Sequence, residues 1–416
     1  MGLSHGISRK RLLELAALSF MAMVISGPMT PGFAQDANWV TAWGASQQSL
    51  AETKISNASL RMIARVTLPG DGLRIRLDNN FGKAPVIFGH VTVGPRVRGA
   101  ALAAGLVKPV TFGGKTSVTV PAGGTVQSDA VAMHVDAEQD IGVSLFVSGA
   151  DVQPSQHNNA QVTSYLTENG AGDLTDAADG KAFTAKTTRM FWLKSIDVLA
   201  TGPASSIIAF GDSITDGTCT TLDAHDRWED VVSQRLALQT PIRRAIVNEG
   251  IGGNTVIDVA GYNPPIGSPT GVDRLERDVL SHSGISHVVL FEGTNDIRRG
   301  ATADQLIAGM KNIVARVKAK GIKIVGVTII PRHAVVPGVA DTGWNDEKSK
   351  IRDRVNAWIR KEAGFDAVLD FDRVIRDPEH PEVMIQAYNC GDGVHPAPIG
   401  YFQMGKSVDL GVFEVR

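Results

Sequence analysis

The sequence has few cysteines, few aromatic residues and no strong excess of one charge. With 2 cysteines in 416 residues, it excludes a disulfide-dense small domain and a multi-cysteine metal site, and allows one disulfide at most. The 41 Lys and Arg residues nearly balance the 43 Asp and Glu residues, so the strongly basic face of a nucleic-acid-binding protein is not expected. A charged fraction of 20% beside a hydrophobic fraction of 43% excludes a disordered chain. The length suggests two or three globular domains.

Long apolar runs are also missing, except near the N-terminus. The basic stretch Arg9–Arg11 precedes an apolar run of about a dozen residues, which ends in small residues around Ala34. This run is shorter than the roughly 20 residues that span a bilayer, and it contains Glu14. We therefore expect residues 1–34 to be a signal peptide and the protein to be exported to the periplasm or the extracellular space. No cysteine follows the run, so no lipoprotein anchor is expected.

The pattern of apolar residues changes near residue 200. Before it, short alternating runs separated by glycine-rich turns predict strands, and no segment has a convincing helical period. The expected strands are 59–66, 73–77, 86–93, 117–120, 130–135, 141–147 and 190–199. This pattern predicts an antiparallel, jelly-roll-like β-sandwich as an accessory domain over residues 35–200.

After residue 200, short apolar runs alternate with helical patterns. The expected strands are 207–210, 245–247, 287–291, 323–330 and 367–369. Thr302 and Gln305 match a capping box before a helical pattern that ends at Gly321, and a second pattern begins at Ile351. The alternation predicts an α/β domain over residues 201–416, with helices on both faces of a parallel sheet. In such a sheet, ligands bind at the carboxyl ends of the strands.

Four loops at these strand ends carry residues suited to chemistry. Ser213 follows an apolar strand at a turn whose N–H groups can stabilise negative charge, although a helix cap is the commoner use of such a serine. The glycines of Gly250–Gly253 allow close approach to a ligand, or form a tight turn. Asn295 offers a neutral amide donor. Asp392 and His395 can pair a carboxylate with an imidazole, or be metal ligands or part of a plain turn.

Several other motifs are absent from the sequence. Thr215 stands where the Gly-x-Ser-x-Gly motif of α/β-hydrolases needs its second glycine. Thr255 stands where a dinucleotide-binding Gly-x-Gly-x-x-Gly loop needs its third. The metalloprotease motif His-Glu-x-x-His does not occur.

Together and in this order, the four loops resemble the motif blocks of the SGNH (GDSL) hydrolase family. The matching stretches are Gly211-Asp212-Ser213-Ile214, Asn248…Gly250…Gly253, Gly293-Thr294-Asn295-Asp296 and Asp392-x-x-His395. The resemblance covers about residues 205–410 and implies a flavodoxin-like α/β domain. Further stretches, among them Arg227-Trp228 and Arg274 with Arg277–Leu280, are similar to a secreted bacterial branch related to xylan esterases. In that branch a β-rich domain commonly precedes the hydrolase domain.

The resemblance implies a serine-esterase mechanism without a cofactor or metal. Ser213 is the implied nucleophile, His395 the base and Asp392 the residue that orients it. The implied oxyanion hole consists of the backbone N–H groups of Ser213 and Gly253 and the amide of Asn295. We expect a secreted carboxylic-ester hydrolase that removes short acyl groups, with a small-molecule or polysaccharide ester as substrate and acetylated carbohydrate as the first candidate. The alternatives are a lipase, arylesterase or lactonase of the same fold, or a non-catalytic carbohydrate-binding protein.

Two further features concern residues outside these motifs. Cys219 lies six residues after Ser213 and Cys390 five before His395, so a disulfide is expected if the loops converge, and two buried free thiols are the alternative. His157 lies in a polar stretch of the β-rich segment and is expected at the surface, the alternative being that it projects toward the site.

Overall fold

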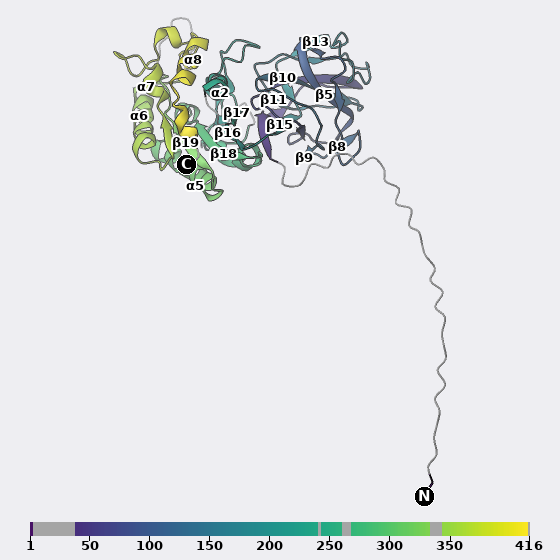
Figure 1. The fold of residues 1–416 in the computed structure, drawn as a ribbon. Helices are drawn as coiled ribbons and strands as arrows, with labels where there is room; N and C mark the ends of the chain where they lie inside the picture. The colour runs from purple at the N-terminus through teal and green to yellow at the C-terminus, as the bar shows by residue number, and fades with distance from the viewer. Residues whose placement is uncertain (3–37, 240–242, 260–267, 333–342, 415–416) are drawn as a thin grey trace. The chain divides into compact units, whose positions relative to one another are not determined.

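The computed structural model describes residues 1–2, 38–239, 243–259, 268–332 and 343–414. The expected signal peptide, residues 1–34, lies almost wholly outside these ranges, so it stays a prediction. Residues 38–416 form one compact unit, in which Figure 1 shows an N-terminal group of strands and a C-terminal group of strands and helices. Across the described ranges, no helix has the length and apolar character needed to cross a membrane.

The strands before residue 200 form three sheets with antiparallel pairing. Their orders are β1-β15-β4-β9, β13-β12-β3-β10-β5-β6 with β7 and β8 also on β5, and β14-β11-β2. The bounds are β1 Trp39–Gly44, β2 Ser49–Leu50, β3 Ala58–Val66, β4 Leu73–Asp78, β5 Val86–Arg98, β6 Ala101–Leu102, β7 Lys108–Pro109, β8 Val118–Val120, β9 Thr125–Gln127, β10 Gln139–Val147, β11 Ser155–His157, β12 Ser164–Leu166, β13 Ala185–Thr187, β14 Met190–Phe191 and β15 Leu193–Leu199. The grouping of these sheets as one jelly-roll-like domain ending at residue 200 stays a prediction.

One expected strand is wrong. Residues 130–135 make only isolated bridges, from Val131 to Leu73 and from Val135 to Gly70. The alternating burial of Val131, Met133 and Val135 is as expected. The ladder that β9 forms with β4 is interrupted at Ser128, whose hydroxyl accepts the backbone N–H of Ile75 at 2.9 Å.

The strands after residue 200 form one parallel sheet in the order β17-β16-β18-β19-β20. Numbered along the chain this order is 2-1-3-4-5, that of flavodoxin-like sheets. The strands are β16 Ala204–Gly211, β17 Arg243–Gly250, β18 Ile285–Phe291, β19 Lys323–Val327 and β20 Ala367–Leu369. The strand order reverses between β16 and β18, and open α/β sheets bind ligands at this switch point.

Helices pack on both faces of the parallel sheet, as expected. Their bounds are α1 Ser213–Asp216, α2 Trp228–Gln239, α3 Gly271–Arg274, the π-helical turn Leu275–Leu280, α4 Thr294–Arg298, α5 Ala303–Ala319, α6 Asp346–Lys361, α7 Phe371–Ile375 and α8 Pro398–Ser407, with short 3₁₀ turns at Gln386–Tyr388 and Leu410–Phe413. The capping box of Thr302 and Gln305 is confirmed at the start of α5. One core contains buried residues of α5 and α6, and the other contains those of α2, α7 and α8.

The β-rich segment covers the free edge of the parallel sheet. The backbone N–H and C=O of Ile246 on β17 both bond to the hydroxyl of Thr67, at 3.0 Å each. In addition, the Ser206 hydroxyl donates to the carbonyl oxygen of Thr41 at 3.0 Å. The Thr67 bonds satisfy polar groups of Ile246 that an uncovered edge strand would expose, and the Ser206 bond links the β-rich segment to the neighbouring strand β16.

Candidate active site

Ser213 lies at the first residue of α1, immediately after β16. The turn is a capped helix start, because the Asp212 side chain accepts the N–H of Ile214 at 3.0 Å. N–H groups in the first turn of a helix have no partner within the helix, so the Ser213 N–H is suited to binding an anion. Gly217 ends the helix in the left-handed region at φ 96°, and its N–H donates to the Ser213 carbonyl oxygen. The Ser213 side chain is therefore held at the carboxyl end of the sheet.

The Ser213, His395 and Asp392 side chains form a continuous hydrogen-bonded chain. Ser213 Oγ lies 2.8 Å from His395 Nε2, and His395 Nδ1 lies 2.5 Å from Asp392 Oδ2. Because the carboxylate accepts from Nδ1, Nε2 is left as the acceptor for the Ser213 hydroxyl. The predicted nucleophile, base and orienting carboxylate therefore lie together although 182 residues separate Ser213 from His395.

Asp392 is held as a carboxylate. Its Oδ1 accepts the backbone N–H groups of Val394 and His395, at 2.8 Å each. Partial burial opposes ionisation, but the hydrogen bond and charge of His395, together with these two N–H groups, outweigh it and lower the pKa of Asp392 to about 2. The group that orients His395 is therefore charged across the ordinary pH range.

The glycine loop after β17 lies against α1. Gly250 has no room for a side chain, since a Cβ there would collide with the backbone of Thr215 and Asp216. Gly253 adopts φ +75° in a turn closed by the Asn254 N–H and the Ile251 carbonyl oxygen, 3.1 Å apart. Among the described residues, the Gly253 N–H has no hydrogen-bond acceptor. This N–H is therefore available to a ligand.

Asn295 lies in the first turn of α4, after β18. Its Nδ2 donates to the Asn254 carbonyl oxygen at 3.0 Å, which uses one of its two N–H donors. Its Oδ1 lies 3.4 Å from Arg332 Nη1. These contacts determine the orientation of the amide and leave its second N–H for a ligand.

Asp296, next to Asn295, organises the same loop. It is fully buried and accepts the N–H groups of Val256 and Ile257, at 3.0 and 3.1 Å. Burial raises its pKa to about 8 despite these hydrogen bonds. Asp296 therefore orients the loop that follows the glycine turn.

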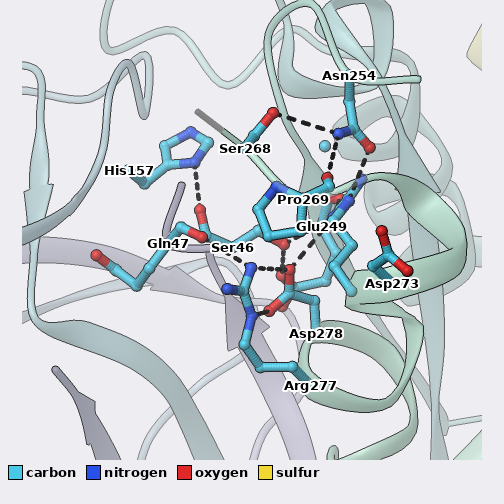
Figure 2. Close-up of polar contacts among 12 residues, drawn as sticks. Ser46, Gln47, His157, Glu249, Asn254, Ser268, Pro269, Asp273, Arg277 and Asp278 are labelled. Atoms are coloured by element: carbon cyan, nitrogen blue, oxygen red, sulfur yellow. Dashed lines mark hydrogen bonds and ion pairs between the residues drawn. The ribbon is translucent and has the colours of Figure 1, made fainter. Parts of the chain in front are cut away.

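Arg274 is a buried residue whose position the sequence did not indicate. Its guanidinium donates to Gly211 O and Glu249 O, at 2.8 Å each, at the carboxyl ends of β16 and β17. It also donates to Asn254 Oδ1 at 2.8 Å and to the Glu292 carboxylate at 3.0 Å. Figure 2 shows Asn254 at this junction, where its Nδ2 also bonds to Pro269 O. One cation thus joins the ends of three parallel strands to the glycine loop.

A disulfide joins Cys219 and Cys390, whose Cα atoms lie 6.2 Å apart. The backbone N–H of Cys390 donates to the carbonyl oxygen of His395 at 3.1 Å. In the described part of the chain, the one grouping with the spacing of metal ligands is Cys219, Cys390 and Asp392, and the disulfide occupies both of its sulfurs. The bridge connects the loop after the nucleophile to the loop of the base.

His157 is not at the surface, contrary to expectation. It is 3% exposed on β11, and its Nε2 lies 2.9 Å from Asp216 Oδ1 at the end of α1. Its polar sequence neighbours suggested a solvated loop, but both of its ring nitrogens have hydrogen-bond partners within the protein. The imidazole contacts the segment that carries Ser213.

A cavity of about 240 Å³ lies beside the glycine loop. Its lining is mostly polar and consists of Thr255, Asp258, Val259, Ser268, Pro269, Thr270, Asp273 and Arg299. Arg299 also donates to the Gly253 carbonyl oxygen at 3.0 Å, so the cavity adjoins the turn that carries the free N–H. Figure 2 shows Ser268, Pro269 and Asp273 near Asn254.

Comparison with known proteins finds a family match over the part of the chain that holds this site. Residues 209–401 match the GDSL-like Lipase/Acylhydrolase family. No curated protein matches the chain. Similar solved structures include a carbohydrate acetylesterase family member from Sinorhizobium meliloti, with 19% identity and a TM-score of 0.38 over 49% of this chain and 94% of that one. Another is a member of the lipolytic protein G-D-S-L family from Veillonella parvula DSM 2008, with 19% identity and a TM-score of 0.34 over 49% of this chain and 96% of that one.

Proposed function

We propose that this chain, whose residues 209–401 match the GDSL-like lipase/acylhydrolase family, is an ester hydrolase that removes short acyl groups by acyl-enzyme chemistry at Ser213. The observation that carries the proposal is the hydrogen-bonded chain from Ser213 Oγ through His395 to Asp392. A hydroxyl, an imidazole and a carboxylate in this order are the groups that nucleophilic ester cleavage needs.

In the proposed reaction, Ser213 Oγ attacks the ester carbonyl carbon while His395 Nε2 accepts the hydroxyl proton. Asp392 stabilises the imidazolium that forms. The oxyanion of the tetrahedral intermediate accepts the N–H groups of Ser213 and Gly253 and the second N–H of Asn295. His395 then protonates the leaving alcohol, and on its return as a base it activates the water that hydrolyses the acyl-enzyme.

We propose an acetylated carbohydrate as the first candidate substrate. The mostly polar lining of the cavity beside the glycine loop suits a hydroxyl-rich alcohol better than a long acyl chain. The carbohydrate acetylesterase among the similar structures is in keeping with this class. A lipase, arylesterase or lactonase activity stays the alternative, and a longer acyl chain would need an apolar channel.

We further propose that the protein is exported and that residues 35–200 act as an accessory β-domain. The basic and apolar pattern of residues 1–34 supports export, and a disulfide is stable in an oxidising compartment. In the carbohydrate-binding alternative, the β-domain would dominate and the hydrolase site would be inactive. The complete set of Ser213, Gly253, Asn295, Asp392 and His395 favours a working enzyme.

A substrate panel tests the proposal. Wild type and Ser213→Ala are compared on acetylated xylan, on p-nitrophenyl esters of increasing chain length and on lactones. We expect wild type to prefer acetyl esters, with a rate that a chelator leaves unchanged, and Ser213→Ala to be folded and inactive. Full activity in Ser213→Ala would refute the nucleophile assignment, and a preference for long chains would refute the substrate class.

A further inference from the structure

His157 lies outside the four motif loops, yet a short chain of hydrogen bonds links it to one of them. It belongs to β11 of the β-rich segment, and its partner Asp216 is the last residue of α1, which begins at Ser213. Both are nearly buried, at 3% and 6% exposure. Buried polar side chains are almost always hydrogen-bonded, so the contact between His157 and Asp216 is a specific one.

The hydrogen bonds of His157 indicate its protonation state. Nδ1 lies 2.9 Å from the Ser46 carbonyl oxygen, a contact drawn in Figure 2, and a carbonyl can only accept. Nε2 faces the Asp216 carboxylate at 2.9 Å and the Asn159 carbonyl oxygen at 3.3 Å. Both ring nitrogens therefore carry a proton, and His157 is an imidazolium paired with a carboxylate. Burial opposes this charge, but Asp216 and the Ser46 carbonyl outweigh it and raise the pKa of His157.

Asp216 links His157 to the glycine loop. Its Oδ1 accepts the hydrogen bond of His157 Nε2, while its Oδ2 accepts the N–H of Gly252 at 3.1 Å. Gly252 directly precedes Gly253, whose N–H is free among the described residues. The loop is also held by the Ile251 N–H to Gly211 O, at 3.1 Å, by Arg299, which donates to the Gly253 carbonyl oxygen at 3.0 Å, and by the bonds at Asn254. Asp216 is the side chain that binds the Gly252 N–H, directly before the Gly253 N–H.

We propose that His157 is a positioning residue for the esterase reaction: through Asp216 it anchors the Gly252 N–H and so keeps the next residue, Gly253, in the orientation that presents its N–H to the oxyanion. The inference rests on the proposed function and extends it by giving the β-rich segment a part in catalysis. Without His157, the Asp216 carboxylate loses its charge partner, and its second oxygen is free to leave Gly252. Arg227, which joins Asp216 O to Ala160 O, would still hold the backbone of α1 in place.

The test compares three histidine variants by steady-state kinetics on p-nitrophenyl acetate. His157→Leu removes both donors, His157→Gln keeps an N–H near the Nε2 position, and His287→Leu is the matched control. His287 is also fully buried, but it lies on β18 and packs against Phe413. Each measured rate is divided by the concentration of active sites, which is determined by complete labelling with a fluorophosphonate. Unfolded protein, which is not labelled, therefore does not lower the apparent kcat.

We expect His157→Leu to lower kcat about 10- to 100-fold with KM within about twofold of wild type. A 10-fold loss is expected if the Gly253 N–H is only displaced, and a 100-fold loss if it no longer reaches the oxyanion. His157→Gln should recover most of the loss, and His287→Leu should keep the wild-type kcat per labelled site. Asp216→Asn should resemble His157→Leu, and the double variant should be no worse than either, since both break one chain of contacts.

Amide hydrogen exchange supplies a readout that does not depend on activity. We expect the Gly252 amide to exchange faster in His157→Leu than in wild type, and His287→Leu to leave it unchanged. A kcat for His157→Leu within twofold of wild type, or additive losses with Asp216→Asn, would overturn the positioning role while leaving the esterase proposal intact. If wild type hydrolyses no ester, the proposed function fails and this role fails with it, even if the exchange result holds.

Discussion

The disulfide between Cys219 and Cys390 should contribute strongly to stability, because it closes a long loop. The sequence separation is 171 residues. For a loop of this length, the chain-entropy relation gives about 5 kcal/mol of stabilisation through the unfolded state. Domains are typically stable by about 5–15 kcal/mol, so this is a large share. We predict that the double variant Cys219→Ser/Cys390→Ser unfolds at much lower urea concentration than wild type.

The same change should also lower activity at temperatures where the fold persists. Cys390 bonds through its backbone to His395, so loss of the bridge loosens the loop that carries Asp392 and His395. The assay is urea unfolding with and without a reductant, followed by hydrolysis of p-nitrophenyl acetate. The reductant should shift wild type toward the double variant and leave the double variant unchanged. A loss of less than about 1 kcal/mol, or two titratable thiols in the untreated protein, would refute the reasoning.

Four further predictions concern three side chains of the site. Asn295→Ala should lower kcat about 10²- to 10³-fold with a smaller effect on KM, in steady-state kinetics, because it removes one oxyanion donor. Asp392→Asn should lower kcat about 10³- to 10⁴-fold by disturbing the His395 tautomer, and circular dichroism should show an intact fold. Because the pKa of Asp392 is lowered to about 2, its carboxylate should stabilise the fold fully above the unfolded pKa of roughly 3.9. This stabilisation should be lost as the pH falls toward 2, and acid unfolding of wild type compared with Asp392→Asn measures the loss. Arg274→Met should cost about 3–5 kcal/mol in urea unfolding, since it leaves Glu292 buried without its partner; a loss below 1 kcal/mol would contradict this.

The motif loops and the parallel sheet could be predicted from the sequence because their signals are local. An apolar run followed by glycine marks the ends of β16, β17 and β18, and the capping box at Thr302 marks the start of α5. Parallel strands place their carboxyl ends at one edge, so the loops of Ser213, Gly253 and Asn295 were expected to meet there. The strand at 130–135 was wrong because alternation predicts which side chains are buried, but not where a side chain such as Ser128 takes the place of a backbone partner in the ladder.

The roles of Arg274 and His157 could not be predicted, because they depend on contacts between distant segments. Arg274 is an ordinary charged residue in sequence, and its burial follows from three strand ends that supply carbonyl and carboxylate acceptors. His157 has polar neighbours, which favoured exposure, and its partner Asp216 is 59 residues away. Both are charges whose burial is tolerable only because the folded chain brings their acceptors together.

Stoichiometric labelling of Ser213 tests the central claim most directly. The protein is treated with a fluorophosphonate, the adduct is measured by intact mass and located by peptide mapping, and the remaining hydrolysis of p-nitrophenyl acetate is followed in parallel. We predict one adduct per chain, on Ser213, with activity lost in proportion to labelling and no adduct in Ser213→Ala. Activity that persists in fully labelled protein, or an adduct at another residue that accompanies the loss, would contradict the account.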